Sequence, residues 1–234
     1  MLARASLPAA AALAPGQNLV RPIAFPRLLD ERWQRIKRVL DVVCALVLGV
    51  AAIPLIVLIA GAILLTSGRP VFYGHMRVGR GRRPIRIWKF RTMVVNADQM
   101  LAGYLSRNPE RAREWQTTHK LKNDPRVTWV GRLLRRTSLD ELPQIWHVLR
   151  GEMSMVGPRP IVEAEVPKYG PTFLLYTNVK PGLTGLWQVS GRSDTSYRRR
   201  AELDSEYIRE WTLGTDLRLL VRTVRAVVVG KGAY

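Results

Sequence analysis

The feature that most constrains this chain is a long run without charge near its N-terminal end. From Val42 to Leu65 there are 24 residues, and none of them is Asp, Glu, Lys or Arg. A helix needs about 20 apolar residues to cross the hydrocarbon core of a bilayer, so this run is long enough to do so. A buried helix of a soluble protein is seldom apolar over such a length. We therefore expect residues 27–69 to form a membrane anchor.

Two features of this run leave the geometry of the anchor open. Pro54 lies near its middle, lacks an amide hydrogen and clashes with the carbonyl of Val50, which predicts a kink. Basic residues flank both ends: Arg32, Arg35, Lys37 and Arg38 come before it, and Arg69, Arg77, Arg80, Arg82 and Arg83 follow it. Positive side chains favour the cytoplasmic side, so the flanks indicate a re-entrant helix that enters and leaves on one face. A kinked spanning helix fits the same residues about equally well.

The charge of the whole chain indicates an anionic partner. Lys and Arg number 37 against 18 Asp and Glu, which gives a net charge of +19. Phospholipid headgroups, nucleic acid and phosphorylated substrates all satisfy this charge. The only cysteine is Cys44 and the three histidines are widely spaced, so neither a disulfide framework nor a zinc site is expected.

The remaining sequence divides into a tail and a domain. Residues 1–26 are rich in Ala and Pro without periodicity, which is typical of a flexible tail. A signal peptide is a weaker alternative, because Pro8 interrupts the short apolar stretch after Arg4. Residues 70–234 are expected to form a compact domain of the α/β class that is mainly helical.

Periodicity predicts several elements of this domain. Strands are expected at residues 71–73 and 85–88, and a helix at about 139–149 that ends at Gly151. Residues at about 96–118 are polar and compatible with helix. Leu203, Tyr207 and Trp211 recur every four residues, which predicts an amphipathic helix.

A last helix is predicted near the C-terminus, with Thr215 as a candidate cap. It carries Arg218, Arg222 and Arg225 on one face, while the rest is apolar. This pattern is typical of a helix at a membrane interface. A core helix with a solvated basic stripe fits equally well.

Asp140 and Glu141 are the candidate catalytic residues. They stand at a predicted helix start just after Arg135 and Arg136. A carboxylate can attack phosphorus and hold a phosphoryl group, and a second carboxylate can hold Mg²⁺. The alternative is a capping box, in which Glu141 bonds the backbone of Ser138. Pro143 weakens this alternative, because its missing amide would fall inside the first turns of such a helix.

Three other stretches carry residues suited to phosphate. In Lys89 to Met93, Lys89 and Arg91 would share one face of a strand. In Met153 to Pro160, two prolines stiffen the backbone around Arg159. In Lys180 to Arg192, glycines permit tight turns before Arg192.

In this order, the stretches resemble the bacterial sugar transferase family, the monotopic phosphoglycosyl transferases that initiate surface glycan assembly on polyprenyl phosphate. The resemblance runs from about Lys37 to Val229. Besides the stretches above, it includes Lys37, Arg38 and Asp41, the apolar run broken by proline, and Asp124 to Thr128.

The resemblance implies a two-step exchange. Asp140 would be the nucleophile on the sugar-linked phosphate of a UDP-sugar, UMP would leave, and polyprenyl (undecaprenyl) phosphate would then take the phosphosugar. Glu141 would help to hold Mg²⁺. Substrate phosphates would contact Arg135 and Arg159, with Lys89, Arg91 and Arg192 as weaker candidates. Galactose and glucose are the sugars that the family suggests, in exopolysaccharide or other surface glycan synthesis.

The resemblance also bears on location. It implies one-sided insertion into the inner membrane, with both ends of the anchor and the catalytic domain on the cytoplasmic face and phospholipid as a partner. The family often has Ser before the proline, where this chain has Ile53, so the bend would depend on Pro54. The tail lies outside the match, and the chain is expected to be a small member without additional membrane helices. A homo-oligomer is compatible with these features.

A function from another class also fits the composition. The +19 charge and seven tryptophans would suit a membrane-attached nucleic-acid or anionic-polymer-binding protein. No recognised nucleic-acid motif accompanies them, and nucleic acid is not expected as a partner of the enzyme.

Overall fold

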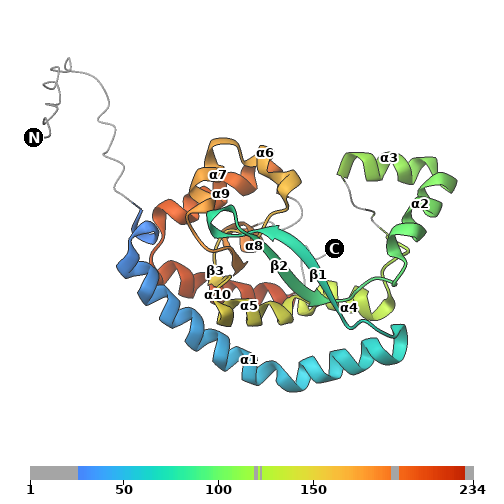
Figure 1. The fold of residues 1–234 in the computed structure, drawn as a ribbon, viewed down its shortest axis with the longest axis horizontal. Helices are drawn as coiled ribbons and strands as arrows, with labels where there is room; N and C mark the ends of the chain where they lie inside the picture. Colours follow the sequence, from blue (N-terminus) through green and yellow to red (C-terminus); the bar gives the residue numbers. More distant parts are fainter. Residues whose placement is uncertain (1–25, 119–120, 122, 191–194, 230–234) are drawn as a thin grey trace, which may run out of the picture.

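The structure is a computed structural model that describes residues 26–118, 121, 123–190 and 195–229. The predicted tail, apart from Pro26, and Arg192 lie outside the described residues. Within them the fold is mainly helical, as predicted, and contains two short two-stranded sheets. Figure 1 shows the helix α1 as an arc beneath the rest of the molecule.

Helix α1 (Glu31–Ser67) contains the whole uncharged run. It follows the short 3₁₀ helix η1 (Arg27–Leu29), and the carboxylate of Asp30 caps it by accepting the Arg32 N–H at 2.7 Å. Gly68, at a φ of 70°, ends it. Pro54 lies inside the helix, which continues past it and curves (Figure 1).

One side of α1 packs against the domain over most of the helix. Its buried residues are Lys37, Asp41, Ala45, Ile59 and Ile63. The other side exposes large apolar residues to solvent, among them Val47, Val50, Val57 and Leu58. By length and composition, α1 is the one helix in the described part of the chain that could cross a membrane.

Strands β1 (Phe72–Val78) and β2 (Pro84–Phe90) pair antiparallel, so both predicted strands exist and are longer than expected. The 3₁₀ turn η2 (Arg80–Arg82) joins them, with Gly81 at a φ of 67°. The polar stretch at about 96–118, predicted to be compatible with helix, is helical and forms two helices, α2 (Ala97–Arg107) and α3 (Pro109–Thr118). Asn108 leaves the helical region because a proline follows it.

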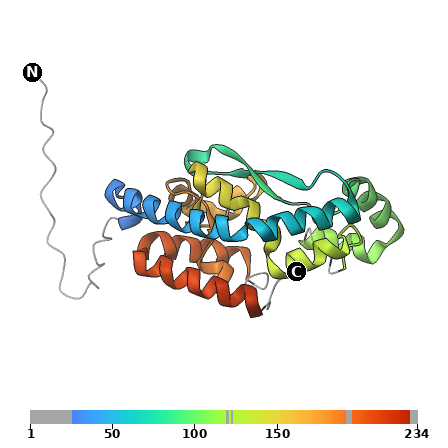
Figure 2. The same ribbon diagram turned by 90° about the horizontal axis from the view of Figure 1, so that it is seen from below.

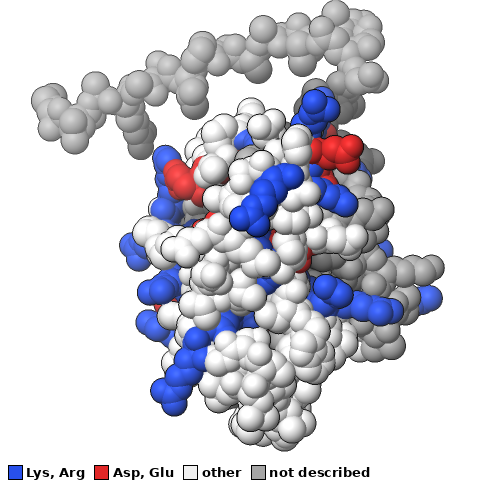
Figure 3. Space-filling model, turned by 90° about the vertical axis from the view of Figure 1, so that its right-hand side faces the viewer, with Lys and Arg blue, Asp and Glu red and all other residues white. Residues whose placement is uncertain are grey.

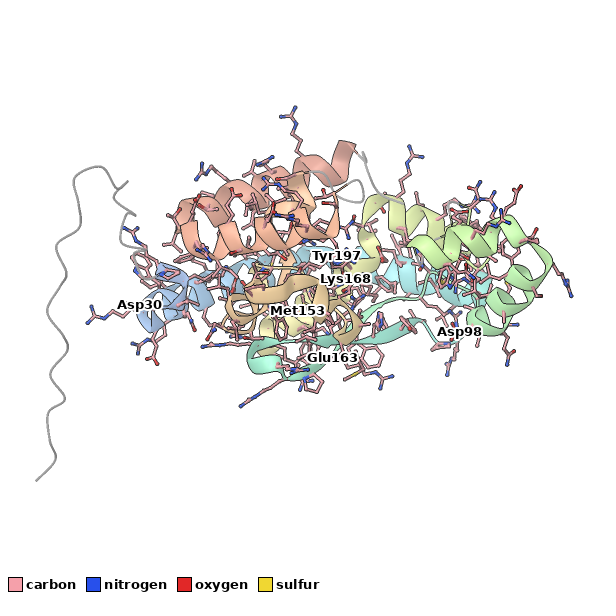
Figure 4. The ribbon with its side chains drawn as sticks, turned by 90° about the horizontal axis from the view of Figure 1, so that it is seen from above. Asp30, Asp98, Met153, Glu163, Lys168 and Tyr197 are labelled. Carbon is pink, nitrogen blue, oxygen red and sulfur yellow. The ribbon has the colours of Figure 1, made fainter. Side chains whose placement is uncertain are left out.

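Helices α2 and α3 project from the body of the molecule (Figure 1). In Figure 4, Asp98 on α2 and Asp30 at the start of α1 lie at opposite ends of the molecule. The helical pair is therefore remote from the first turns of α1.

The segment around the candidate carboxylates contains three helices: α4 (Trp129–Thr137), the 3₁₀ helix η3 (Leu139–Gln144) and α5 (Ile145–Arg150). The predicted helix at 139–149 is therefore α-helical only from Ile145. Pro143 accounts for the difference, because it donates no hydrogen bond. Gly151 ends α5 at a φ of 80°, as predicted.

The second sheet pairs β3 (Ser154–Val156) parallel to β4 (Gly182–Thr184). Between them come η4 (Glu163–Glu165), α6 (Val166–Tyr169), η5 (Gly170–Thr172) and α7 (Phe173–Thr177), and α8 (Leu186–Ser190) follows β4. Gly157 and Gly182 pack backbone against backbone, which leaves no room for a Cβ at either position.

Helices α9 (Tyr197–Glu210) and α10 (Leu213–Val229) complete the chain. Leu203, Tyr207 and Trp211 are buried, which confirms the predicted apolar face. The predicted cap of the last helix is wrong: the hydroxyl of Thr212 accepts the Thr215 N–H at 3.1 Å.

Helix α10 lies beside α1 when the molecule is seen from below (Figure 2). Among its described apolar side chains Leu219 is buried, whereas Leu217, Val221 and Val224 are exposed. A helix of the core would bury these three side chains, so their exposure counts against the core alternative.

Candidate functional site

Asp140 and Glu141 lie on η3, whose position α4 determines. The Thr128 hydroxyl caps α4 by accepting the Gly131 N–H at 2.9 Å. Gly131 lies directly against the backbone of Thr92, where a Cβ would collide with the carbonyl. Ser138, at a φ of 57°, then turns the chain from α4 into η3. This close crossing brings the two carboxylates beneath β2.

Lys89 of β2 is the cation closest to the pair. Its ammonium donates a hydrogen bond to Glu141 Oε1 and lies 3.9 Å from Asp140 Oδ2. The capping-box alternative is wrong, because the Ser138 side chain makes no capping hydrogen bond and the Glu141 carboxylate bonds Lys89. Both carboxylates are therefore available for chemistry.

The two adjacent carboxylates have different affinities for protons. Burial raises the pKa of Asp140 to about 6 against the opposing effect of Lys89, and the charge of Glu141 adds to this rise. Burial also acts to raise the pKa of Glu141, but Lys89, Arg159 and Arg77 outweigh it and lower that pKa. At neutral pH both groups are ionised, and Asp140 is the more basic of the two.

A small cavity adjoins Glu141. Its lining residues are His75, Arg77, Ile87, Lys89, Glu141, Gln144, Arg159, Pro160, Gly182, Leu183 and Gln188. It brings three cationic side chains from β1, β2 and the loop after β3 to one carboxylate. Such a group of cations suits the phosphates of a nucleotide.

Arg77 and His75 are residues that the sequence patterns did not identify as part of a site. Arg77 donates to the Pro160 carbonyl at 3.3 Å, and its other terminal nitrogen lies 3.2 Å from His75 Nδ1. Burial and the neighbouring Arg159 lower the pKa of Arg77. Alternation along β1 puts residues 75 and 77 on the face that Lys89 shares on β2, which could have indicated them.

Arg159 packs against an aromatic ring and lies near a buried acid. The carboxyl of Asp204, which accepts the Tyr169 hydroxyl at 2.8 Å, is close enough for the charge of Arg159 to act on its pKa. The guanidinium of Arg159 lies 5.4 Å from the centre of the Trp187 ring. The residue between the two prolines therefore reaches the cavity from a rigid support.

The other predicted residues lie at different distances from the pair. Arg135 donates to Thr92 Oγ1 at 2.9 Å and is close enough to affect the charge of Asp140, although it forms no ion pair with it. Arg91 does not join the site, because its guanidinium donates to the carbonyls of Ser67 and Gly68 at the end of α1.

The expected shared face of Lys89 and Arg91 is wrong for a physical reason: β2 ends at Phe90, so alternation stops there. The stretch from Asp124 to Thr128 is similarly structural. Arg126 forms a bidentate ion pair with Asp124, with contacts of 2.6 to 3.1 Å. These residues support the start of α4 and do not contact the carboxylates.

The carboxylate pair fits a magnesium ion that a substrate also holds. In the described residues no three His, Cys, Asp or Glu side chains converge as a complete metal site. Mg²⁺ is commonly held by one or two carboxylates together with phosphate oxygens and water. The carboxylate of Glu141 is partly exposed beside the cavity, so it can serve as such a ligand if its ion pair with Lys89 breaks.

Comparison with known proteins identifies the family of the chain. The model of the family described as bacterial sugar transferase matches residues 32–230. The exopolysaccharide production protein ExoY of Sinorhizobium fredii is 46% identical over 198 residues, which cover 85% of this chain and 88% of that protein.

Two longer relatives match through part of their length. The UDP-galactose-lipid carrier transferase of Erwinia amylovora is 47% identical over 199 residues, 85% of this chain and 42% of that protein. The UDP-glucose:undecaprenyl-phosphate glucose-1-phosphate transferase of Escherichia coli is 40% identical over 207 residues, 85% of this chain and 41% of that protein. The chain thus spans less than half the length of these two proteins.

Proposed function

The chain belongs to the bacterial sugar transferase family, and we propose that it moves a sugar 1-phosphate from a UDP-sugar to polyprenyl (undecaprenyl) phosphate. The observation that carries this proposal is the pair Asp140 and Glu141 on η3, beside Lys89, Arg77 and Arg159. The names of the relatives support the same substrates, in exopolysaccharide production. The family match and the relatives give no support to the nucleic-acid-binding alternative.

The reaction follows from the difference between the two carboxylates. A carboxylate oxygen of Asp140 attacks the phosphorus that bears the sugar, and the bond to the bridging oxygen breaks as UMP leaves. An oxygen of polyprenyl phosphate then attacks the same phosphorus, which releases Asp140 and forms a polyprenyl diphosphate sugar. Arg159, Arg77 and Lys89 orient the diphosphate, and Arg135 favours the ionised form of Asp140.

Glu141 is the proposed ligand of Mg²⁺. When bound, the ion supplies positive charge next to the phosphate oxygens. Glu141 would hold the ion in place of its present ion pair with Lys89, and Lys89 would then be free to contact a phosphate.

We propose further that α1 is a re-entrant anchor with both ends on the cytoplasmic face of the inner membrane. Near its first turns, Lys37 bonds Asp216. Near its last turns, Ile59 and Ile63 pack with Phe90 and other apolar residues of the domain. A spanning helix could not keep both contacts, because the domain would have to enter the bilayer.

The surface agrees with a membrane at this side. Figure 3 shows a lower region without charged side chains, where α1 lies in Figure 1, and basic side chains border it. The exposed apolar residues of α10 and its arginines suit the same interface with phospholipid.

Release of UMP tests the proposed reaction. Purified protein in an uncharged detergent, with Mg²⁺, undecaprenyl phosphate and either UDP-galactose or UDP-glucose, should release UMP and form the lipid product. Without the lipid, intact-protein mass spectrometry should detect one phosphosugar on the wild type and on the matched control Asp98→Asn. Absence of UMP release with a full panel of UDP-sugars would overturn the proposal.

Cysteine labelling tests the anchor. In a Cys44→Ala background, Arg35→Cys and Arg69→Cys should both react with a membrane-impermeant maleimide in inside-out vesicles and be protected in intact spheroplasts. Opposite accessibility at the two sites would establish a spanning helix.

A further inference from the structure

A second and larger cavity lies near the first turns of α1. It has a volume of about 360 Å³. Its lining residues are Leu28, Glu31, Gln34, Arg35, Lys37, Arg38, Asp41, Arg80, Ser154, Val156, Gly157, Val179, Lys180 and Tyr207. None of them lines the cavity beside Glu141, so the catalytic proposal makes no use of this space.

The two cavities lie against different parts of the same two chain segments. Val156 and Gly157 face the larger cavity, and Arg159 and Pro160 face the smaller one. Likewise, Lys180 lines the larger cavity, whereas Gly182 lines the smaller. Gly157 from the lining of the larger cavity and Gly182 from that of the smaller one are packed backbone to backbone, so no gap lies between these two residues.

The larger cavity has more positive than negative charge. Five cationic and two acidic side chains line it. Two of the cations already have partners, because Lys37 bonds Asp216 and Arg38 donates to the carbonyls of Val148 and Leu149. Cationic side chains that converge on one cavity form an anion site when some of their donors remain open.

Lys180 supplies such open donors. Among the described residues its ammonium has no hydrogen-bonded or ion-paired partner, although the side chain is half-buried. Burial and the nearby charges of Arg38 and Arg80 lower its pKa, as expected where cations face one another. Arg80, on the exposed turn η2, likewise has no carboxylate partner in the described part of the chain.

We propose that this cavity binds a phosphate ester, with Lys180 and Arg80 as its main contacts. Leu28, Val156, Val179 and the Tyr207 ring give it an apolar wall, which suits a phosphate carried on an organic group better than a free ion. Two sources share this chemistry, the headgroup of an acidic phospholipid and a soluble phosphate ester. The site does not depend on the reaction at Asp140.

The reactivity of Lys180 tests the site. The full chain, in an uncharged detergent at constant ionic strength, is treated briefly with an amine-acetylating reagent, and acetylation is measured by peptide mass spectrometry. The probes are dihexanoylphosphatidylglycerol, sn-glycerol 3-phosphate and inorganic phosphate. Dihexanoylphosphatidylcholine is the zwitterionic control, and the exposed Lys168 is the reference amine.

A phosphate probe should slow acetylation of Lys180 at least about threefold, since occupancy of two thirds of the sites has that effect. Lys168 should react at an unchanged rate. Protection by phosphatidylglycerol alone would identify a lipid headgroup, and equal protection by glycerol phosphate would identify a soluble ester. Unchanged acetylation with every probe, or equal protection by phosphatidylcholine, would overturn the proposal.

Two variants make the result specific to the cavity. Arg80→Gln removes a cavity cation on an exposed turn, so it should abolish the protection while UMP release stays unchanged. Arg107→Gln, which removes an exposed arginine on α2, should keep the full protection. Equal protection in Arg80→Gln and the wild type would contradict the assigned contacts.

Discussion

Two clusters in this molecule have the same composition, one lysine and two carboxylates. They differ in burial and in the number of hydrogen bonds that their carboxylates accept. Lys37 lies 2.5 Å from Asp216 and 3.7 Å from Asp41, with side chains that are 9%, 11% and 7% exposed. Asp41 also accepts the Met155 N–H, and Asp216 accepts the Tyr207 hydroxyl. We call these three residues the anchor cluster.

The second cluster, Lys89 with Asp140 and Glu141, is looser. Its side chains are 23%, 14% and 27% exposed, and no other side chain of the described residues is recorded as donating a hydrogen bond to the carboxylates. We call it the catalytic cluster. The additional hydrogen-bond donors fix the carboxylates of the anchor cluster in a structural role. The carboxylate oxygens of the catalytic cluster lack such donors, so they can bind a metal or attack phosphorus. Burial and the number of hydrogen-bond donors therefore distinguish the structural cluster from the proposed catalytic one better than composition does.

The strongest test of this difference is Asp140→Asn. An amide has no free anionic oxygen, so UMP release should fall at least about 1,000-fold and the phosphosugar adduct should vanish. Initial rates of UMP release and intact-protein mass spectrometry measure both effects. An active Asp140→Asn protein would remove Asp140 as the nucleophile.

The next test measures the stability of the fold and not the activity. Asp216→Asn leaves Lys37 with only the more distant Asp41, so it should lower the free energy of unfolding by about 3 kcal/mol. Asp140→Asn should leave stability equal or higher, because it removes a buried charge beside Glu141. Urea unfolding in detergent, followed by tryptophan fluorescence, measures both variants. Equal losses would show that the two clusters have the same structural role.

The pH dependence should distinguish the catalytic cluster as well. Because the pKa of Asp140 is about 6, kcat/KM for UMP release should rise as pH increases through 6. A raised carboxyl pKa also means that the folded state binds the proton more tightly, so ionisation of Asp140 destabilises the fold. The stability advantage of Asp140→Asn should therefore be present above pH 6 and vanish towards pH 4. An advantage that is independent of pH would contradict this origin.

The smallest expected effect concerns the extra donor of the anchor cluster. Tyr207→Phe removes the hydroxyl that bonds Asp216 and the Val156 carbonyl, which should cost about 1 kcal/mol of stability. Since the catalytic cluster lies elsewhere, UMP release should be unchanged. Thermal unfolding followed by circular dichroism would detect the loss, with Tyr104→Phe on α2 as the matched control.

The sequence predicted the parts of the fold that depend on local chemistry. The uncharged run, Gly151 and the spacing of Leu203, Tyr207 and Trp211 specify helices and their ends through composition and periodicity. The boundary between α2 and α3 was not predicted, although Pro109 marks it in the polar stretch at about 96–118.

The site was harder to predict, because its members meet through tertiary contacts. No local pattern shows that Glu141 bonds Lys89 across 52 residues, or that Arg91 turns to the end of α1 one residue after β2 stops. In the sequence Arg77 is only a basic residue after the apolar run, because its place beside Glu141 depends on the pairing of β1 with β2. The ordered resemblance to a family supplied the roles of Asp140 and Glu141, which remain proposals.

The ion pair between Lys37 and Asp216 also sets an order of events during biosynthesis. Its partners are 179 residues apart, so at roughly 5–20 residues per second the ribosome makes Asp216 about 10 to 35 s after Lys37. During that interval the sequence of α1 has been made, but Lys37 still lacks Asp216, the nearer of its two ion-pair partners. A nascent chain that stops before α10 never acquires it. The ion pair that joins the first turns of α1 to α10 therefore forms only after the start of α10 has been made.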